Sequence, residues 1–231
     1  SYKSILESLI HAGTENEVRV NVKSIHSEYI DKENIRKNLN DLDGIIVAPG
    51  FGQRGLDGKI LAVEYARVNK IPFLGICLGM QMAVIEYARN VKKIRYANST
   101  EISEKCKDPV IDLMTSQKEI VDMGGTMRLG AWDCEILKNT ISHKVYKKKL
   151  ISERHRHRYE FNNEYSKKIF DDKFIVAGFN PDTKLVEIIE NIDHPWFVGV
   201  QFHPEYKSSV YNPHPIFVNF VKASLKKYLN K

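Results

Sequence analysis

The first half of the chain shows two patterns of apolar and polar positions. Residues 18–25 alternate with a period of two, as a half-buried strand does, and residues 43–50 and 71–76 are short apolar runs that end in turns. Apolar residues spaced three and four apart predict helices over residues 1–13, 32–42, 59–70 and 78–91. Strands and helices therefore alternate, and the apolar runs are typical of parallel strands that helices cover on both faces.

From about residue 100 the pattern changes to shorter strands separated by turns. These strands are expected at residues 110–114, 126–137, 156–162, 173–179 and 185–190. Residues 196–205 return to a buried strand, and residues 215–229 have the period of a closing helix. We predict one α/β domain over residues 1–231. Its sheet is open and mostly parallel with helices on both faces, and a smaller set of antiparallel strands is added to it.

The stretch IPFLGICLGMQMAVIEYA, residues 71–88, carries a single charge at Glu86 and raises the question of a membrane span. A proline and two glycines crowd one end of it beside a strand-like hexapeptide, which indicates a strand, a turn and a helix instead. Residues 1–13 lack the basic region and apolar core of a secretory signal. We therefore expect no contact with a membrane.

Composition narrows the class of protein further. Lys and Arg number 35 against 29 Asp and Glu, and both signs are spread along the chain, so nucleic acid is not an expected partner. The three cysteines, Cys77, Cys106 and Cys134, are odd in number and widely spaced. They form neither a disulfide framework nor a CxxC metal pair, which predicts a reducing, cytoplasmic setting.

The sequence GICLG at residues 75–79 has the spacing of a nucleophile elbow, with cysteine in place of serine. The glycines let strand and helix approach each other around a strained turn. The turn places the Cys77 sulfur at a helix N-terminus, where the helix dipole favours the thiolate. The alternative is a buried cysteine in a tight turn between strand and helix.

His203 is the candidate base among the eight histidines. It follows the apolar strand directly, at the end where open α/β sheets place catalytic groups. Glu205 lies two residues further on, and the turn at Pro204 can aim its carboxylate at the imidazole. A Cys77–His203–Glu205 triad follows, in which the glutamate holds the tautomer that accepts the thiol proton. A surface turn is the alternative interpretation of the HPE sequence.

The sequence APGFGQRG at residues 48–55 is the candidate oxyanion loop. It follows a predicted strand, and its glycines can present backbone N–H groups to a developing negative charge. The N–H of Leu78, the residue after the nucleophile, is the second donor. A phosphate-binding loop is the rival interpretation, but neither GK[ST] nor GxGxxG is present.

The elbow GICLGMQ, the PGFG turn and the late FHPE sequence resemble the class I (triad) glutamine amidotransferases. Four further stretches resemble the glutaminase domain of CTP synthases, namely residues 50–59, 97–101, 124–130 and 153–160. The resemblance extends from residue 1 to about residue 225. Another class I glutaminase, such as that of GMP synthase, fits two of these stretches less well. A regulatory module that keeps the fold without turnover is the alternative from a different class.

The resemblance implies that Cys77, His203 and Glu205 hydrolyse L-glutamine to glutamate and ammonia through a glutamyl thioester. Gly50 and Leu78 form the oxyanion hole in that scheme. The implied substrate contacts are Gly50, Phe51, Leu78, Gly79, Met80, Gln81, Glu101 and Arg158. An arginine suits the α-carboxylate of glutamine and a glutamate suits its α-ammonium group.

The resemblance also implies partners beyond this chain. In the family a synthase domain, absent here, uses ATP, UTP and Mg²⁺ to make CTP from the ammonia, and the full enzyme is a homotetramer. GTP is the allosteric activator, and we place it near Arg54 and Arg128. We expect no cofactor and no metal in this domain. His155 and His157 lie at i,i+2 as a metal pair does, but three arginines in the same run would repel a cation.

The chain departs from the family pattern in two places. Family members read Val-Pro-Gly-Gly-Phe-Gly where residues 47–52 read Val-Ala-Pro-Gly-Phe-Gly. Pro49 has no N–H, so Gly50 is the first donor that this loop can offer. The family's glutaminase also begins with a strand ahead of residues 1–13. Without that strand we expect a sheet with a missing central member and an exposed pairing edge.

Overall fold

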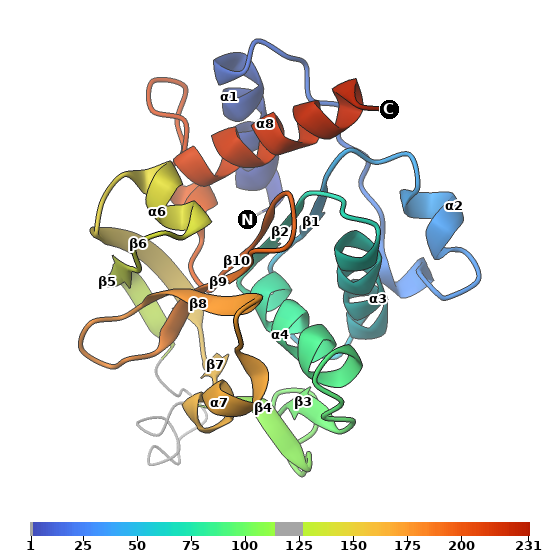
Figure 1. Ribbon diagram of the computed structural model, residues 1–231, viewed down its shortest axis with the longest axis vertical. Coiled ribbons are helices and arrows are strands. Elements are labelled where there is room, and N and C mark those ends of the chain that lie inside the picture. The colour runs from blue at the N-terminus through green and yellow to red at the C-terminus, as the bar shows by residue number, and fades with distance from the viewer. Residues whose placement is uncertain (1, 114–126) are drawn as a thin grey trace.

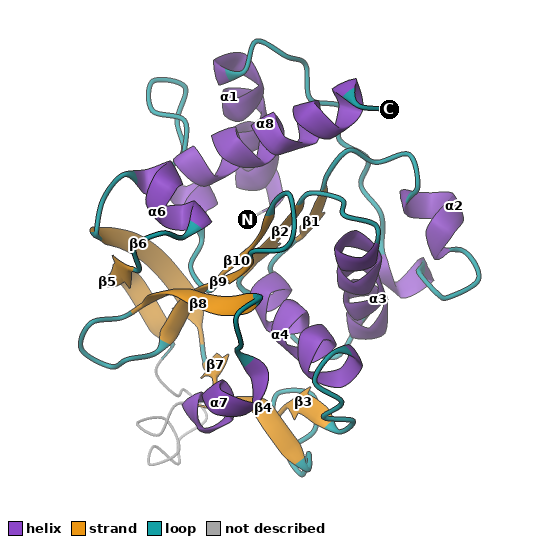
Figure 2. Ribbon diagram, in the orientation of Figure 1, coloured by secondary structure: helices purple, strands orange, loops and turns teal. Residues whose placement is uncertain are grey.

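The computed structural model describes residues 2–113 and 127–231. Its main feature is a curled sheet of seven strands with helices on both faces, as Figures 1 and 2 show. The strand order is β1 (Ile45–Val47), β2 (Phe73–Ile76), β10 (Phe197–Val200), β9 (Val186–Asn191), β8 (Phe174–Phe179), β5 (Arg128–Ile136) and β6 (Leu150–His157). The predicted α/β fold with helices on both faces is confirmed.

Three strands form the parallel part of the sheet: β1 (Ile45–Val47), β2 (Phe73–Ile76) and β10 (Phe197–Val200). The long helices that cover it are α3 (Leu56–Val68) and α4 (Leu78–Asn90) on one face, and α1 (Tyr2–Glu15) and α8 (Pro215–Leu229) on the other. Side chains of β2 alternate between the two cores. Phe73 packs with α3 and α4, whereas Leu74 and Ile76 pack with α1 and α8. The strand is therefore buried on both faces, as its apolar run predicts.

Antiparallel strands continue the same sheet beyond β10. They are β9 (Val186–Asn191), β8 (Phe174–Phe179), β5 (Arg128–Ile136) and β6 (Leu150–His157). A second sheet holds β3 (Ala97–Ser99), β4 (Asp108–Leu113) and β7 (Tyr159–Phe161). The structure thus contains the additional antiparallel strands that the sequence predicted. They extend the parallel strands because β9 pairs with the free edge of β10.

Short helices connect these strands. They are η1 (Ser27–Tyr29), α2 (Ile35–Leu39), α6 (Ile141–Tyr146), η2 (Asn163–Tyr165), α7 (Ser166–Ile169) and η3 (Pro204–Lys207). The helix predicted over residues 32–42 is therefore shorter than expected. The ends of the strands predicted at 110–114 and 126–137, and part of the 124–130 motif, lie outside the described residues.

The strand predicted at residues 18–25 is not formed. Val18 and Val20 still pack against the core, so the apolar half of the pattern is used. A strand also needs a hydrogen-bonded neighbour, and no strand in the described part of the chain pairs with this segment. Strand β1 lies at the edge of the seven-stranded sheet, with β2 as its partner.

Residues 71–88, which raised the question of a membrane span, form β2, a turn and most of α4. None of the described helices is long and apolar enough to cross a membrane. The single charge of this stretch, Glu86, is fully buried. Its two carboxylate oxygens accept hydrogen bonds of 2.8 and 2.6 Å from the guanidinium of Arg67 on α3. Asn90 donates a third. The buried charge is thus compensated and joins α3 to α4.

Replacing Arg67 by methionine should destabilise the chain by about 3–5 kcal/mol, because it leaves the Glu86 carboxylate buried without its partner. The double variant Arg67→Met/Glu86→Met should recover much of that loss, since no buried charge remains. Urea denaturation of the two single variants, the double variant and the wild type measures the effect.

The matched control is Lys149→Met, which opens an exposed ion pair with Glu135. It should change the free energy of unfolding little. Equal losses from Arg67→Met and Lys149→Met would contradict the structural role of the buried pair.

Candidate active site

Cys77 lies in the turn between β2 and α4, as the elbow sequence predicts. Its φ of 52° and ψ of −105° are strained values for a residue with a side chain. Two glycines make the turn possible. A Cβ on Gly75 would lie 2.7 Å from the Gly79 carbonyl carbon, and a Cβ on Gly79 would lie 2.0 Å from the Val47 carbonyl oxygen. The Cys77 N–H donates to the Val200 carbonyl at 2.7 Å, which ties the turn to β10.

His203 and Glu205 lie just beyond β10, the strand that pairs with β2. The His203 Nδ1 and a Glu205 carboxylate oxygen are 2.7 Å apart, and both side chains are buried. The Tyr206 ring stacks on the imidazole with its centroid 5.1 Å away. Nδ1 must be the protonated nitrogen if the carboxylate is ionised. Nε2 has no hydrogen-bond partner among the described residues and is free to accept a proton.

Burial dominates the electrostatics of the Cys77 thiol. Burial is the largest cause of a pKa of about 12 for Cys77, and the negative charges of Glu205, Glu160 and Glu101 raise this pKa further. The backbone N–H of Leu78, at the helix N-terminus, lowers the pKa in the direction expected from the sequence, but burial outweighs it. A nucleophilic sulfur has to be generated by transfer of its proton to a base.

The candidate oxyanion donors lie next to each other. A Cβ on Gly50 would lie 3.3 Å from the side chain of Leu78 and 3.3 Å from the Lys59 ammonium nitrogen. The Tyr2 hydroxyl donates to the Pro49 carbonyl at 3.2 Å. The loop of residues 48–50 is thus held against the first residue of α4.

The predicted substrate residues have different surroundings. Gln81 is buried and donates to the carbonyl of Tyr159 at 3.0 Å. Glu101 accepts a hydrogen bond of 2.9 Å from the Gly52 N–H. The Arg158 Nε is buried and has no partner among the described residues. Each of these three side chains is polar and anchored near the candidate oxyanion loop or β7.

The other members of the predicted substrate set contribute differently. Phe51 is 89% exposed. Met80 is fully buried, and its Cγ would lie 3.1 Å from a Cβ on Gly199. Gly79 is packed against Val47. Met80 and Gly79 therefore offer only backbone groups to a ligand.

Gln201 and Lys59 belong to this site although the sequence analysis did not select them. Gln201 is fully buried, and its amide nitrogen lies 3.7 Å from the Cys77 sulfur, while its carbonyl oxygen accepts a 3.2 Å hydrogen bond from Gln81. Lys59 donates to the Ala48 carbonyl at 3.0 Å. A polar residue within the apolar run FVGVQF was the signal that could have identified Gln201.

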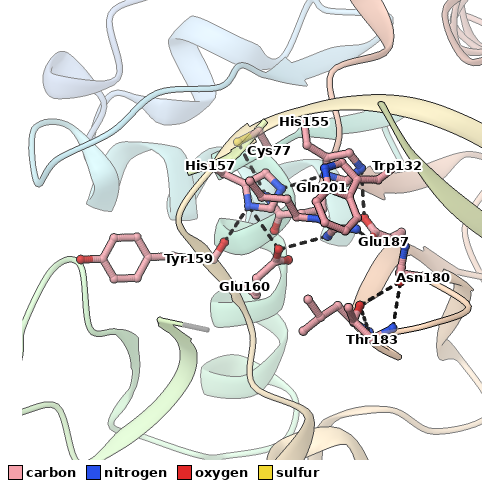
Figure 3. A network of polar contacts seen from close by, with 12 residues as sticks. Cys77, Trp132, His155, His157, Tyr159, Glu160, Asn180, Thr183, Glu187 and Gln201 are labelled. Carbon is pink, nitrogen blue, oxygen red and sulfur yellow. Dashed lines mark hydrogen bonds and ion pairs between the residues drawn. The ribbon is translucent and has the colours of Figure 1, made fainter. Parts of the chain in front are cut away.

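A buried polar network lies next to the site (Figure 3) and includes His155, His157, Glu160 and Glu187. Arg128 pairs with both carboxyls of this network. Its guanidinium is 3.1 Å from Glu160 and 2.6 Å from Glu187, and the Trp132 ring lies 4.7 Å from its carbon. Burial raises the pKa of both carboxyls. Since one guanidinium faces two carboxyls, one of them retains its proton at neutral pH.

The two arginines predicted near GTP have different environments. Arg128 is buried with its charge already paired. Arg54 is exposed and pairs with Glu28. The GTP assignment remains a prediction for both, and its basis for Arg128 is weaker because the guanidinium does not face solvent.

His155 and His157 lie on the buried face of β6, whereas Arg154 and Arg156 are exposed on the other. These two arginines therefore point away from the histidines, and the positive charge near the pair is that of Arg128. Burial and this charge lower the pKa of both imidazoles. His157 donates from Nδ1 to the Tyr159 carbonyl, which can only accept, so its Nε2 accepts from His155 Nδ1 at 2.8 Å. Both imidazoles are neutral in this arrangement.

Fold and site together define an α/β protein in which a cysteine elbow and a His–Glu pair lie at the carboxyl ends of adjacent parallel strands. The family model for glutamine amidotransferase class-I matches residues 1–223. The chain therefore belongs to the class-I glutamine amidotransferase family and is an enzyme domain.

Within this family the chain is of the CTP synthase glutaminase type. A CTP synthase of Christiangramia forsetii is 63% identical over 224 residues, which cover 97% of this chain and 41% of the relative. A CTP synthase of Clostridium kluyveri is 56% identical over 225 residues, covering 97% and 42%. The chain thus spans about two fifths of the length of these relatives.

Solved structures agree with this placement. The glutaminase domain of Trypanosoma brucei CTPS with bound acivicin has a TM-score of 0.92 and 38% identity, covering 97% of this chain and 88% of that one. A glutamine amidotransferase from Thermotoga maritima, at 12% identity and a TM-score of 0.57 over 98% of this chain and 93% of that one, shows the shared fold alone.

The buried histidine pair predicts a pH dependence of stability. Burial, with the charge of Arg128 nearby, lowers the pKa of His155 to about 2 and of His157 to about 3. Below about pH 6.5 these imidazoles bind protons in the unfolded chain but not in the folded chain. The free energy of unfolding therefore decreases as the pH falls. Between about pH 6.5 and 4.5, wild type should lose up to about 3 kcal/mol relative to His157→Gln.

Urea denaturation of both proteins at several pH values measures this difference. Comparing the two chains cancels the contribution of the neighbouring carboxyls, which titrate in both. His26→Gln is the control for loss of an exposed imidazole. A difference between wild type and His157→Gln that stays constant with pH would rule out the neutral pair.

Proposed function

We propose that the chain hydrolyses L-glutamine through a triad of Cys77, His203 and Glu205. The observation that carries this proposal is the buried 2.7 Å contact between His203 and Glu205, which leaves Nε2 without a partner in the described chain. This pair follows the strand adjacent to the one that leads into Cys77. A base, its orienting carboxylate and a strained cysteine turn therefore lie at one edge of the sheet.

The high pKa of Cys77 determines the first step of the proposed reaction. The thiol proton moves to Nε2 of His203 as the sulfur attacks the carboxamide carbon, and the carbonyl π pair moves to oxygen. Glu205 stabilises the resulting imidazolium. The backbone N–H groups of Gly50 and Leu78 stabilise the oxyanion.

Collapse of this intermediate releases ammonia. The oxyanion re-forms the carbonyl, the C–N bond breaks, and the imidazolium of His203 gives its proton to the departing nitrogen, which leaves a glutamyl thioester on Cys77. Water then attacks the thioester and gives a proton to His203. The C–S bond breaks, glutamate leaves, and the proton returns to the sulfur.

Three polar side chains are proposed to bind the amino-acid end of glutamine. Arg158 suits the α-carboxylate, and its buried Nε without a partner supports this role. Glu101 suits the α-ammonium group, and Gln81 offers a polar amide from α4. Backbone groups of Phe51, Gly79 and Met80 complete the predicted set of contacts.

We further propose that the ammonia serves a synthase domain that converts UTP to CTP with ATP and Mg²⁺, under activation by GTP. The support is the likeness to CTP synthases that are more than twice as long as this chain. The exposed side chain of Phe51 in the candidate oxyanion loop, with 89% of its surface accessible, supports a docking partner as well.

The first test is the intact mass of the chain after exposure to a glutamine-mimicking electrophile. We expect one adduct in the wild type, protection by glutamine, and no adduct in Cys77→Ala, because Cys77 is the proposed nucleophile and follows the strand that pairs with the one leading to His203. Cys106→Ala is the matched control and should react as the wild type does. An adduct that persists in Cys77→Ala, or no adduct in the wild type, would contradict the proposed site.

Replacing Glu205 by glutamine tests the third member of the triad. The amide keeps the shape of the side chain but no longer stabilises the imidazolium, so kcat for glutamine hydrolysis should fall by roughly 10²- to 10⁴-fold with KM little changed. Release of ammonia and glutamate by the chain measures both constants. Unchanged kcat in Glu205→Gln would remove the carboxylate from the mechanism.

A further inference from the structure

Lys59 is a half-buried lysine in the first turn of α3. A lysine in this position is unfavourable on two counts, since burial penalises its charge and the N-terminus of a helix repels cations. No carboxylate in the described part of the chain forms an ion pair with it within 4.0 Å. The surroundings of its ammonium group therefore require another explanation.

That group is directed at the candidate oxyanion loop. Its Nζ donates to the carbonyl of Ala48 at 3.0 Å, and it would lie 3.3 Å from a Cβ on Gly50. The same Gly50 position is 3.3 Å from Leu78, the residue after the nucleophile. Lys59 and Leu78 thus flank the residue that offers the first N–H of the loop.

The electrostatics point in the same direction. Burial lowers the pKa of Lys59, and negative charge on Cys77 raises it. Such coupling is reciprocal, so an ammonium on Lys59 favours negative charge at the sulfur. Burial and three carboxylates work against that charge, as the raised pKa of Cys77 shows.

We propose that Lys59 is a positioning residue for glutamine hydrolysis, which fixes the backbone of Ala48 to Gly50 and sets a positive charge next to the two candidate oxyanion donors. Its hydrogen bond to Ala48 holds the loop in place for the oxyanion. Its charge favours the anion that forms first on sulfur and then on oxygen. The inference rests on the proposed function of Cys77, because a cysteine that does not react needs no such partner.

The test is the rate at which iodoacetamide alkylates Cys77 from about pH 6 to about pH 10, followed by intact mass. Lys59→Met removes the charge and should slow alkylation roughly tenfold at a given pH, since an opposite charge nearby lowers a pKa by one unit or more. Lys59→Arg keeps the charge and should stay within about threefold of the wild type. In the hydrolysis assay Lys59→Met should lower kcat more than it raises KM.

The matched control is Lys70→Met, because Lys70 also donates from Nζ to a backbone carbonyl, that of Asp193 at 2.7 Å. It should alkylate as the wild type does. Thermal unfolding of each variant checks that the fold is intact. Equal loss of reactivity in Lys59→Met and Lys59→Arg would show that the charge has no role, and an unchanged profile in Lys59→Met would overturn the proposal.

The outcomes separate this inference from the proposed function. If wild-type Cys77 forms its glutamine-protected adduct while Lys59→Met reacts at the same rate, the inference on Lys59 fails and the triad stands. If the wild type forms no such adduct, the proposed triad is wrong, and the proposed role of Lys59 is then wrong as well.

Discussion

The close approach of α4 to the carboxyl ends of β1 and β2 is the constraint on which the site depends. Gly79 touches the carbonyl of Val47 on β1, and Gly75 touches the backbone of Gly79, so a side chain at either glycine would separate the helix from the sheet. This packing forces Cys77 into its strained turn and aligns Leu78 with the loop that follows β1. The nucleophile and both candidate oxyanion donors are therefore placed by backbone contacts.

The same packing that shapes the site also buries the thiol and suppresses its ionisation. A cysteine with a pKa near 12 is inert at neutral pH unless a base takes its proton during attack. In the proposed mechanism the buried pair of His203 and Glu205 supplies such a base. In that scheme the sulfur becomes nucleophilic as its proton moves to His203, and not as a thiolate at rest.

The parts of the site that the sequence predicted are formed by residues that lie close together in the chain. The GICLG and HPE motifs each lie within a few residues, so spacing alone predicted the turn at Cys77 and the pairing of His203 with Glu205. The strand predicted at residues 18–25 failed because alternation describes one chain segment, whereas a strand also needs a neighbour. The buried environment of Arg128 was not predicted, for a related reason. Its motif did not reveal that two carboxyls distant in sequence meet it in the interior.

The antiparallel half of the sheet is part of the site, although the motifs lie in the parallel half. The N–H of His203 donates to the carbonyl of Arg154 on β6, and Gln81 donates to the carbonyl of Tyr159, which also accepts from His157. The histidine base and the helix behind the nucleophile are both anchored to the chain segment that follows β5. Displacement of β6 would thus move the base relative to Cys77, so the buried network around Arg128 holds the geometry on which the proposed chemistry relies.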